Sequence, residues 1–121
     1  MQSLEAGGLV FEIENRTFGK DGGPALMVFG EVDGNRVQLL RFDCFHKAPH
    51  YHYDPTGRNE QQKLDPGADN VGWTVEQVRT RLDEMIQKAG YDALASQTDM
   101  EAVGAAADQI EAALRSEPET T

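Results

Sequence analysis

Residues 25–42 read ALMVFGEVDGNRVQLLRF, and this stretch decides the fold of the chain. An apolar run over residues 25–32 is followed by Asp33-Gly34-Asn35 and by a second apolar run over residues 37–45. Glycine and asparagine tolerate positive φ angles, so this tripeptide is a strong signal for a tight turn between two strands. The stretch therefore predicts an antiparallel hairpin.

Further strands are expected on both sides of this hairpin. Residues 9–14 (LVFEIE) alternate between apolar and polar side chains, a period typical of a half-buried strand. Residues 17–24 contain three glycines and a proline, and we expect them to form a loop. Beyond Pro49, residues 50–53 (HYHY) are expected to form a short fourth strand. The sequence thus predicts an antiparallel meander of three to four strands.

Helices are expected in the C-terminal half, after a long polar loop over residues 58–72. Thr74 and Gln77 form a capping box, and Gly90 suits the position after the helix end. An apolar stripe follows at helical spacing: Val75, Val78, Leu82, Met85, Ile86 and Ala89. A second capping box, Thr98-Asp99-Met100-Glu101, is expected to begin a helix that reaches residue 115.

Strands first and helices second indicate an α+β fold, in which two or three C-terminal helices pack on one face of an antiparallel sheet. The 121 residues fit a single domain over residues 1–115, followed by a frayed tail over residues 116–121. No apolar run is long enough to span a membrane, and the first residues lack the charge and apolar core of a signal peptide. With a single cysteine, the chain is expected to be cytoplasmic.

The chain is acidic, with a net charge of −10, but the charge is unevenly spread. Residues 1–35 carry −4, residues 36–63 carry +2 and residues 64–121 carry −8. The overall field repels nucleic acid and anionic membranes, so we expect neither as a partner. Only the middle segment favours an anion, with Arg41, Lys47 and Arg58 as candidate anion-binding residues.

The middle segment also holds all three histidines and the only cysteine: Cys44, His46, His50 and His52. On a strand, His50 and His52 point to the same side, with Tyr51 and Tyr53 on the other. These four residues are candidate ligands of a metal, and their nitrogen and sulfur donors suit zinc. The alternative is that the histidines are solvated or hydrogen-bonded residues at the edge of the sheet.

A second hypothesis is acid–base chemistry on RNA or another phosphate substrate. Neutral histidine accepts a proton and imidazolium donates one, so His50 and His52 are candidate catalytic residues, with Arg41 and Asp43 beside them. The alternative is that Arg41 and Asp43 simply form an ion pair. A cysteine nucleophile at Cys44 is less favoured, because a cysteine among apolar neighbours is usually a small buried side chain.

A third hypothesis is an interaction domain without chemistry. In the helix over residues 99–115, apolar residues recur at spacings of three and four, flanked by alanines and a glycine. This narrow seam suits close packing, either onto the sheet of the same chain or onto a protein partner or a second copy in a homodimer.

Arg41-Phe42-Asp43, followed by Ala48-Pro49-His50 and His52, resembles the central segment of TumE-type toxin proteins of bacterial toxin–antitoxin pairs. This resemblance covers about twenty residues and implies that Arg41, Asp43, His50 and His52 act in RNA-directed chemistry. The chain as a whole also resembles the small bacterial domains of unknown function. The preferred interpretation is a small binding or interaction domain with no assignable activity, and the alternative is a His-centred site that binds metal or hydrolyses a phosphate ester.

Overall fold

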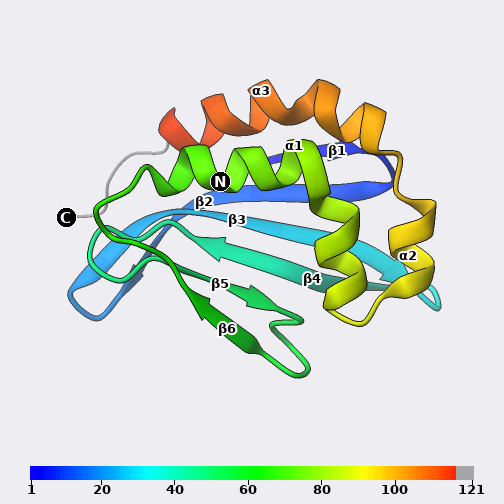
Figure 1. The fold of residues 1–121 in the computed structure, drawn as a ribbon, viewed down its shortest axis with the longest axis horizontal. Coiled ribbons are helices and arrows are strands. Elements are labelled where there is room, and N and C mark those ends of the chain that lie inside the picture. Colours follow the sequence, from blue (N-terminus) through cyan, green and yellow to red (C-terminus); the bar gives the residue numbers. More distant parts are fainter. Residues whose placement is uncertain (117–121) are drawn as a thin grey trace.

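The computed structural model describes residues 1–116, which form one antiparallel sheet and a layer of helices on one of its faces (Figure 1). The strands are β1 (Gln2–Ala6), β2 (Leu9–Phe18), β3 (Asp21–Val32), β4 (Asn35–Asp43), β5 (His50–Tyr53) and β6 (Glu60–Lys63). The helices are α1 (Asn70–Lys88), α2 (Asp92–Gln97) and α3 (Met100–Ser116). The expected α+β class with helices on one face is confirmed. Of the expected frayed tail, Ser116 ends α3, and residues 117–121 lie outside the described residues.

The sheet has six strands in the described residues, in the order of the chain, rather than the expected three to four. The two additional strands, β1 and β6, are the edges of the sheet and carry mostly polar side chains. An edge strand needs no alternating apolar face, because it pairs on one side only and lies largely in solvent. The polar residues 60–63 (EQQK) therefore give no strand signal, which is the reason that the sequence predicts a loop over residues 58–72.

The expected loop over residues 17–24 is also mostly strand. β2 and β3 continue to Phe18 and Asp21, which pair directly around a two-residue turn at Gly19-Lys20. Gly23 has no room for a side chain, since a Cβ atom there would lie 2.4 Å from the carbonyl oxygen of Cys44. The glycines in this segment therefore serve close strand packing as well as a turn.

A β-bulge in β4 places two consecutive leucines in the core. Val28 pairs with Leu40 while Phe29 pairs with Gln38, so Leu39 is the extra residue. Leu39 and Leu40 are both fully buried, although strict alternation predicts that Leu39 shares a face with Arg41 and Asp43. The bulge resets the alternation by one residue, which leaves Arg41 and Asp43 on the face opposite to Leu40 and Phe42.

Helix α1 begins five residues earlier than the capping box predicts. Asp69 is its N-cap and accepts a hydrogen bond from the backbone N–H of Gly72, whereas Thr74 is buried within the helix. An aspartate side chain caps a helix in the same way as a threonine side chain, so the sequence is compatible with a helix start at either residue. The apolar stripe is confirmed as buried, and Gly90 follows the helix with a φ of +104°.

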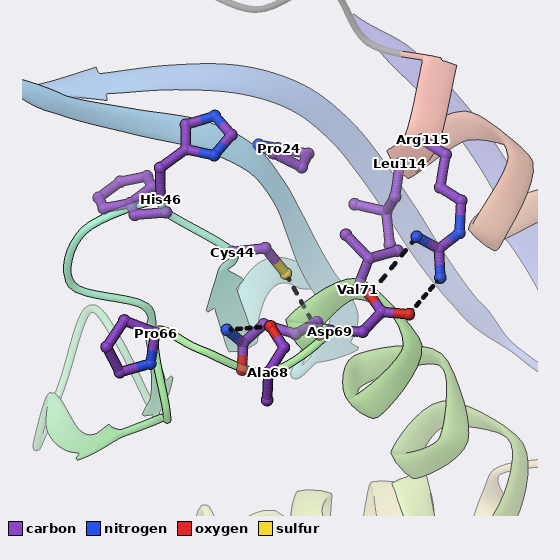
Figure 2. Close-up of a pocket in the computed structure, with 11 residues that line it drawn as sticks. Pro24, Cys44, His46, Pro66, Ala68, Asp69, Val71, Leu114 and Arg115 are labelled. Atoms are coloured by element: carbon purple, nitrogen blue, oxygen red, sulfur yellow. Dashed lines mark hydrogen bonds and ion pairs between the residues drawn. The ribbon is translucent and has the colours of Figure 1, made fainter.

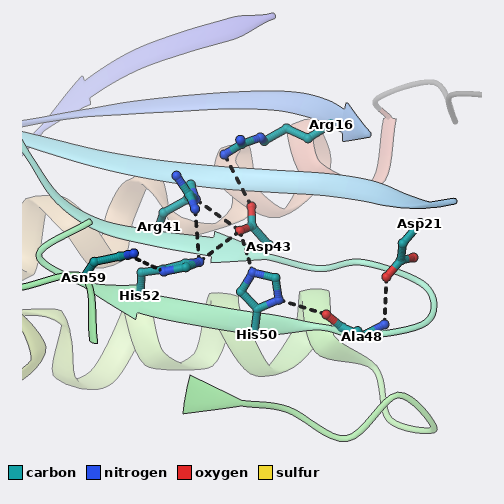
Figure 3. A network of polar contacts seen from close by, with 8 residues as sticks. All are labelled: Arg16, Asp21, Arg41, Asp43, Ala48, His50, His52 and Asn59. Carbon is teal, nitrogen blue, oxygen red and sulfur yellow. Dashed lines mark hydrogen bonds and ion pairs between the residues drawn. The ribbon is translucent and has the colours of Figure 1, made fainter. Parts of the chain in front are cut away.

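Helix α3 packs its apolar seam inside the domain. Asp99, rather than Thr98, caps the helix by accepting hydrogen bonds from the N–H groups of Glu101 and Ala102. The buried residues of α3 are Val103, Ala107, Ile110, Ala113 and Leu114, and they join the core formed by α1 and the sheet. Within residues 1–116, no helix covers the opposite face of the sheet (Figure 1), and side chains of alternate strand residues are presented there (Figure 3). None of the helices in the described residues is long and apolar enough to cross a membrane.

Candidate functional site

The chain reverses over residues 44–49, with bends at residues 46–48, so that β5 pairs antiparallel with β4 and brings two histidines beside Arg41 and Asp43. In this register Asp43 pairs with His50 and Arg41 pairs with His52. Residues directly opposite in a sheet share a face, and all four lie on the helix-free face, whereas Tyr51 and Tyr53 contact the core (Figure 3). The structure therefore gathers the four candidate catalytic residues in one cluster.

Asp43 is the centre of this cluster (Figure 3). Its Oδ2 atom lies 3.0 Å from Nε2 of His50, 3.5 Å from Nε2 of His52 and 3.1 Å from Nε of Arg41. Its Oδ1 atom is buried, lies 3.7 Å from Nη1 of Arg16 and accepts no hydrogen bond from the described residues. The carboxylate is thus surrounded by two guanidinium groups and two imidazoles.

Both ring nitrogens of His50 face oxygen acceptors. Nδ1 lies 2.9 Å from the carbonyl oxygen of Ala48, which only accepts hydrogen bonds, and Nε2 lies 3.0 Å from the Asp43 carboxylate. Neutral histidine has one N–H and one lone pair, so it satisfies only one of these acceptors.

His52 faces a donor at one ring nitrogen and an acceptor at the other. Its Nε2 atom lies 3.0 Å from Nη2 of Arg41, and a guanidinium only donates, so Nε2 accepts and the proton of the neutral ring is on Nδ1. Nδ1 then donates to Oδ1 of Asn59 over 2.7 Å. Burial lowers the pKa of His52 below 6.5, and the positive charge of Arg41 lowers it further, which outweighs the opposing effects of Asn59 and Asp43.

Arg16 and Asn59 belong to this cluster, but the sequence alone did not point to them. Arg16 lies on β2, one strand beyond β3, and continues the polar alternation of Glu12 and Glu14 along the same face. Asn59 lies in the turn between β5 and β6. The period-two pattern of β2 was the signal available for Arg16; Asn59 had none, because its position depends on the conformation of the turn.

The accessible side of the cluster is positively charged, and its negative charge is buried. The exposed side-chain fractions are 32% for Arg16, 22% for Arg41 and 15% for His50, but only 5% for His52 and 2% for Asp43. Lys63 on β6 pairs with His50 and adds a further cation on the same face. A ligand that approaches these residues from solvent therefore meets cations before Asp43, although Glu14 on β2 lies on the same face.

The structure places Cys44 and His46 away from the histidines of β5. Cys44 points to the helix side, where its Sγ lies 3.5 Å from the Thr74 hydroxyl and 3.6 Å from the carbonyl oxygen of Asn70. His46 is exposed and, with Cys44, lines a cavity of about 370 Å³ near the start of α1 (Figure 2). Cys44 therefore lies on the other side of the sheet from the histidines of β5, and the four candidate metal ligands do not form one cluster.

Cys44 is expected to be chemically inert in the folded protein. Burial raises the pKa of its thiol to about 11, so the nucleophilic thiolate is scarce at neutral pH. We expect a disulfide reagent to label Cys44 at pH 8 only as fast as the domain opens, and rapidly in denaturant. Stopped-flow labelling with and without urea measures this, and fast labelling of the native protein would contradict the burial of the thiol.

Lys47 and Arg58 do not join Arg41. The backbone N–H of Lys47 donates to Asp21 in the loop before β5, and the Arg58 guanidinium donates to the carbonyl oxygen of Lys88 at the end of α1. Arg58 also lies 3.8 Å from Glu60. Of the three candidate anion-binding residues, the structure brings only Arg41 into the cluster. The second arginine of the cluster is Arg16 of β2.

Comparison with protein families gives one match. The family described as "Domain of unknown function (DUF7700)" matches residues 3–114, which is nearly the whole chain. The chain belongs to the DUF7700 family. This membership confirms the expectation of a small domain of unknown function and gives no support to the TumE-type resemblance. No match was found among curated proteins or among solved structures.

Proposed function

We propose that this DUF7700 domain binds a small oxyanion of the phosphate type on the helix-free face of its sheet. The observation that carries the proposal is the charge balance of the cluster. The guanidinium groups of Arg16 and Arg41 and the imidazole of His50 surround a single carboxylate, that of Asp43, which is buried beneath them. The cluster therefore keeps an excess of positive charge at its accessible rim, although the chain as a whole carries −10.

Unused donors on the two arginines support this proposal. In the described residues, Arg41 uses Nε for Asp43 and Nη2 for His52, which leaves both N–H groups of Nη1 for a ligand. Arg16 only approaches Asp43, at 3.7 Å, and its remaining N–H groups are also not used for hydrogen bonds to the described residues. Guanidinium groups bind oxyanions through pairs of parallel hydrogen bonds, so two arginines supply a complete site.

The small size of the ligand follows from the overall charge. The acidic surface repels long polyanions such as RNA, whereas a small anion is sensitive mainly to charges within about 10 Å at physiological salt. This local binding is also compatible with the expectation of a binding domain without assignable activity.

A metal is the second candidate, because one donor atom from each of Asp43, His50 and His52 lies within 4.8 Å of the others. The two Nδ1–H groups are oriented by oxygen acceptors, as is usual for metal-bound histidines. However, the Arg41 guanidinium contacts both Asp43 and His52. A dication about 4 Å from a guanidinium is repelled by roughly 8 kcal/mol at an effective dielectric constant of about 20, which favours the oxyanion over zinc.

Hydrolysis is less favoured by the hydrogen bonds of the two histidines. All four ring nitrogens already have partners: Ala48 and Asp43 for His50, and Asn59 and Arg41 for His52. General acid–base catalysis requires a ring nitrogen within reach of the substrate proton. The cluster is therefore better suited to binding a phosphate group than to cleaving an ester bond.

The proposal is tested by titrating the full chain with inorganic phosphate. Binding is measured by isothermal calorimetry and by the NMR signals of the arginine side chains. We expect saturable binding that weakens about tenfold or more in Arg16→Gln and in Arg41→Gln, because each loses charge-assisted hydrogen bonds. Arg36→Gln is the matched control, since Arg36 lies on the same face but is paired with Glu12 and stacked on Phe29.

Two outcomes would overturn the proposal. One is phosphate binding that is equally strong in the Arg16, Arg41 and Arg36 variants. The other is the absence of phosphate binding together with one equivalent of bound zinc that is lost in His52→Ala, which would assign the site to a metal.

A further inference from the structure

The turn between β5 and β6 delivers an asparagine side chain to the buried histidine of the cluster. Asn59 has a φ of +50°, and its backbone N–H donates to the carbonyl oxygen of Asp54 over 2.7 Å. Its Oδ1 atom lies 2.7 Å from Nδ1 of His52 (Figure 3). Asn59 is exposed, so its own burial does not explain this contact.

The turn that carries Asn59 is fixed to the helix layer. The Asp54 carboxylate accepts a hydrogen bond from the Tyr91 hydroxyl over 2.5 Å and another from the backbone N–H of Arg58 over 2.8 Å. The Arg58 side chain donates to the carbonyl oxygen of Lys88. These contacts hold the turn in place, so the side chain of Asn59 reaches His52 from a defined position.

We propose that Asn59 is a positioning residue: it selects the tautomer of His52 that holds the Arg41 guanidinium on Asp43, with its remaining N–H groups directed to solvent. The inference concerns the proposed oxyanion site and rests on that site for its function. The contacts that support the inference do not depend on a bound oxyanion, because every one of them is present without a ligand.

The donors and acceptors along this chain of contacts allow one arrangement. Arg41 has only donors, so Nε2 of His52, 3.0 Å from Nη2, must accept. The proton of the neutral ring is then on Nδ1, and Asn59 must offer its oxygen there. With Nη2 held by His52 and Nε held by Asp43, the guanidinium plane is fixed at two points, and the Nη1 edge is left for a ligand.

Position 59 needs the amide group of an asparagine, and not only a residue that adopts the left-handed backbone conformation. Asparagine, aspartate and glycine all tolerate a left-handed backbone, so the turn itself accepts any of the three. An aspartate would offer a negative charge to Nδ1 and favour the doubly protonated ring. An N–H on Nε2 would then face the N–H of Arg41, and the two donors would repel each other. The charged groups facing His52 are Arg41, Asp43 and His50, and its neighbour on β6, Gln61, is neutral.

Two variants separate the chemistry of the side chain from the conformation of the turn. Asn59→Asp keeps the left-handed backbone and changes the amide to a carboxylate, and Asn59→Gly keeps the backbone and removes the side chain. Glu60→Gln, one residue further on the same exposed edge, is the control for a change of charge in this turn. Ring ¹⁵N chemical shifts of histidine distinguish the two neutral tautomers and the doubly protonated form, and they require no ligand.

In the unmodified chain we expect His52 to be the Nδ1–H tautomer at pH 7 and to take up its second proton only below pH 6.5. In Asn59→Asp we expect that proton to be taken up at a higher pH, with faster exchange of the Arg41 Nε–H. Asn59→Gly should give a mixture of the tautomers and the same loss of Arg41 protection, and Glu60→Gln should match the unmodified chain. We expect phosphate affinity to fall about fivefold in both Asn59 variants, the effect of one lost hydrogen bond.

The NMR measurements decide the inference separately from the proposed function. An Nε2–H tautomer or a doubly protonated His52 in the unmodified chain at pH 7 would overturn it, as would unchanged His52 and Arg41 signals in Asn59→Asp. If those signals behave as expected but no variant binds phosphate, the positioning role stands and the oxyanion proposal fails.

Discussion

Replacing Asp43 with alanine is expected to lower the free energy of unfolding by about 3–5 kcal/mol, the usual cost of removing one partner from a buried ion pair. The Asp43 side chain is only 2% exposed and is the shared partner of Arg16, Arg41 and His50. Without it, the two guanidinium groups and the His50 imidazole face one another with no counter-charge. Urea denaturation of the purified chain, followed by circular dichroism, measures the loss.

A surface ion pair provides the matched control for Asp43. Asp108 lies 2.8 Å from Arg79, but its side chain is 88% exposed. Such pairs contribute about 0–1 kcal/mol, so Asp108→Ala should be nearly neutral. Asp43→Asn keeps the shape of the side chain and should still destabilise the domain, because the counter-charge is lost. If both Asp43 variants were as stable as the control, the cluster would not be a buried ionic network.

Introducing a charge into the seam of α3 is expected to have the second large effect. Ile110 is fully buried between the sheet and α1, so Ile110→Asp places a carboxylate in the core without a partner. The domain should lose more than about 4 kcal/mol and be largely unfolded at 25 °C. Thermal denaturation and the dispersion of NMR signals check this.

Ala105→Asp is the control on the exposed side of the same helix. It should cost less than about 1 kcal/mol, because it changes helix propensity and surface charge but no packing. Analytical ultracentrifugation of both variants also tests the homodimer considered for residues 99–115. A folded Ile110→Asp monomer, compared with an unmodified chain that dimerises, would show that the seam is an interface between copies and not part of the core.

The sequence predicted the parts of the fold that depend on local periodicity. The stripe of α1 and the tight turn at residues 33–35 follow from spacing and from residue type alone. The first residue of α1 does not follow from local sequence, since Asp69 and Thr74 are both good N-caps and only packing decides between them. The edge strands β1 and β6 could not be predicted, because β1 turns only Leu4 and Ala6 toward the core and β6 has no apolar residue.

The sequence indicates which types of residue the candidate site contains, but not which of these residues come together. Alternation correctly placed His50 and His52 on one face and Arg41 with Asp43 on one face. It could not show that residues 44–49 reverse the chain so that these two faces coincide, or that Cys44 points toward Thr74. Register between strands depends on the length and shape of the connection, and residues 44–49 carry no standard turn signal.

The meander has a consequence for how the site forms during folding. Each strand pairs with the next in the chain, so every pairing closes a short loop and the entropic cost of each step is small. Arg41, Asp43, His50 and His52 all lie on the hairpin of β4 and β5. The register that brings them together can therefore be established by a segment of the chain that precedes the helices in sequence. In a polypeptide growing from the ribosome, this hairpin emerges before the helices that cover the other face of its sheet.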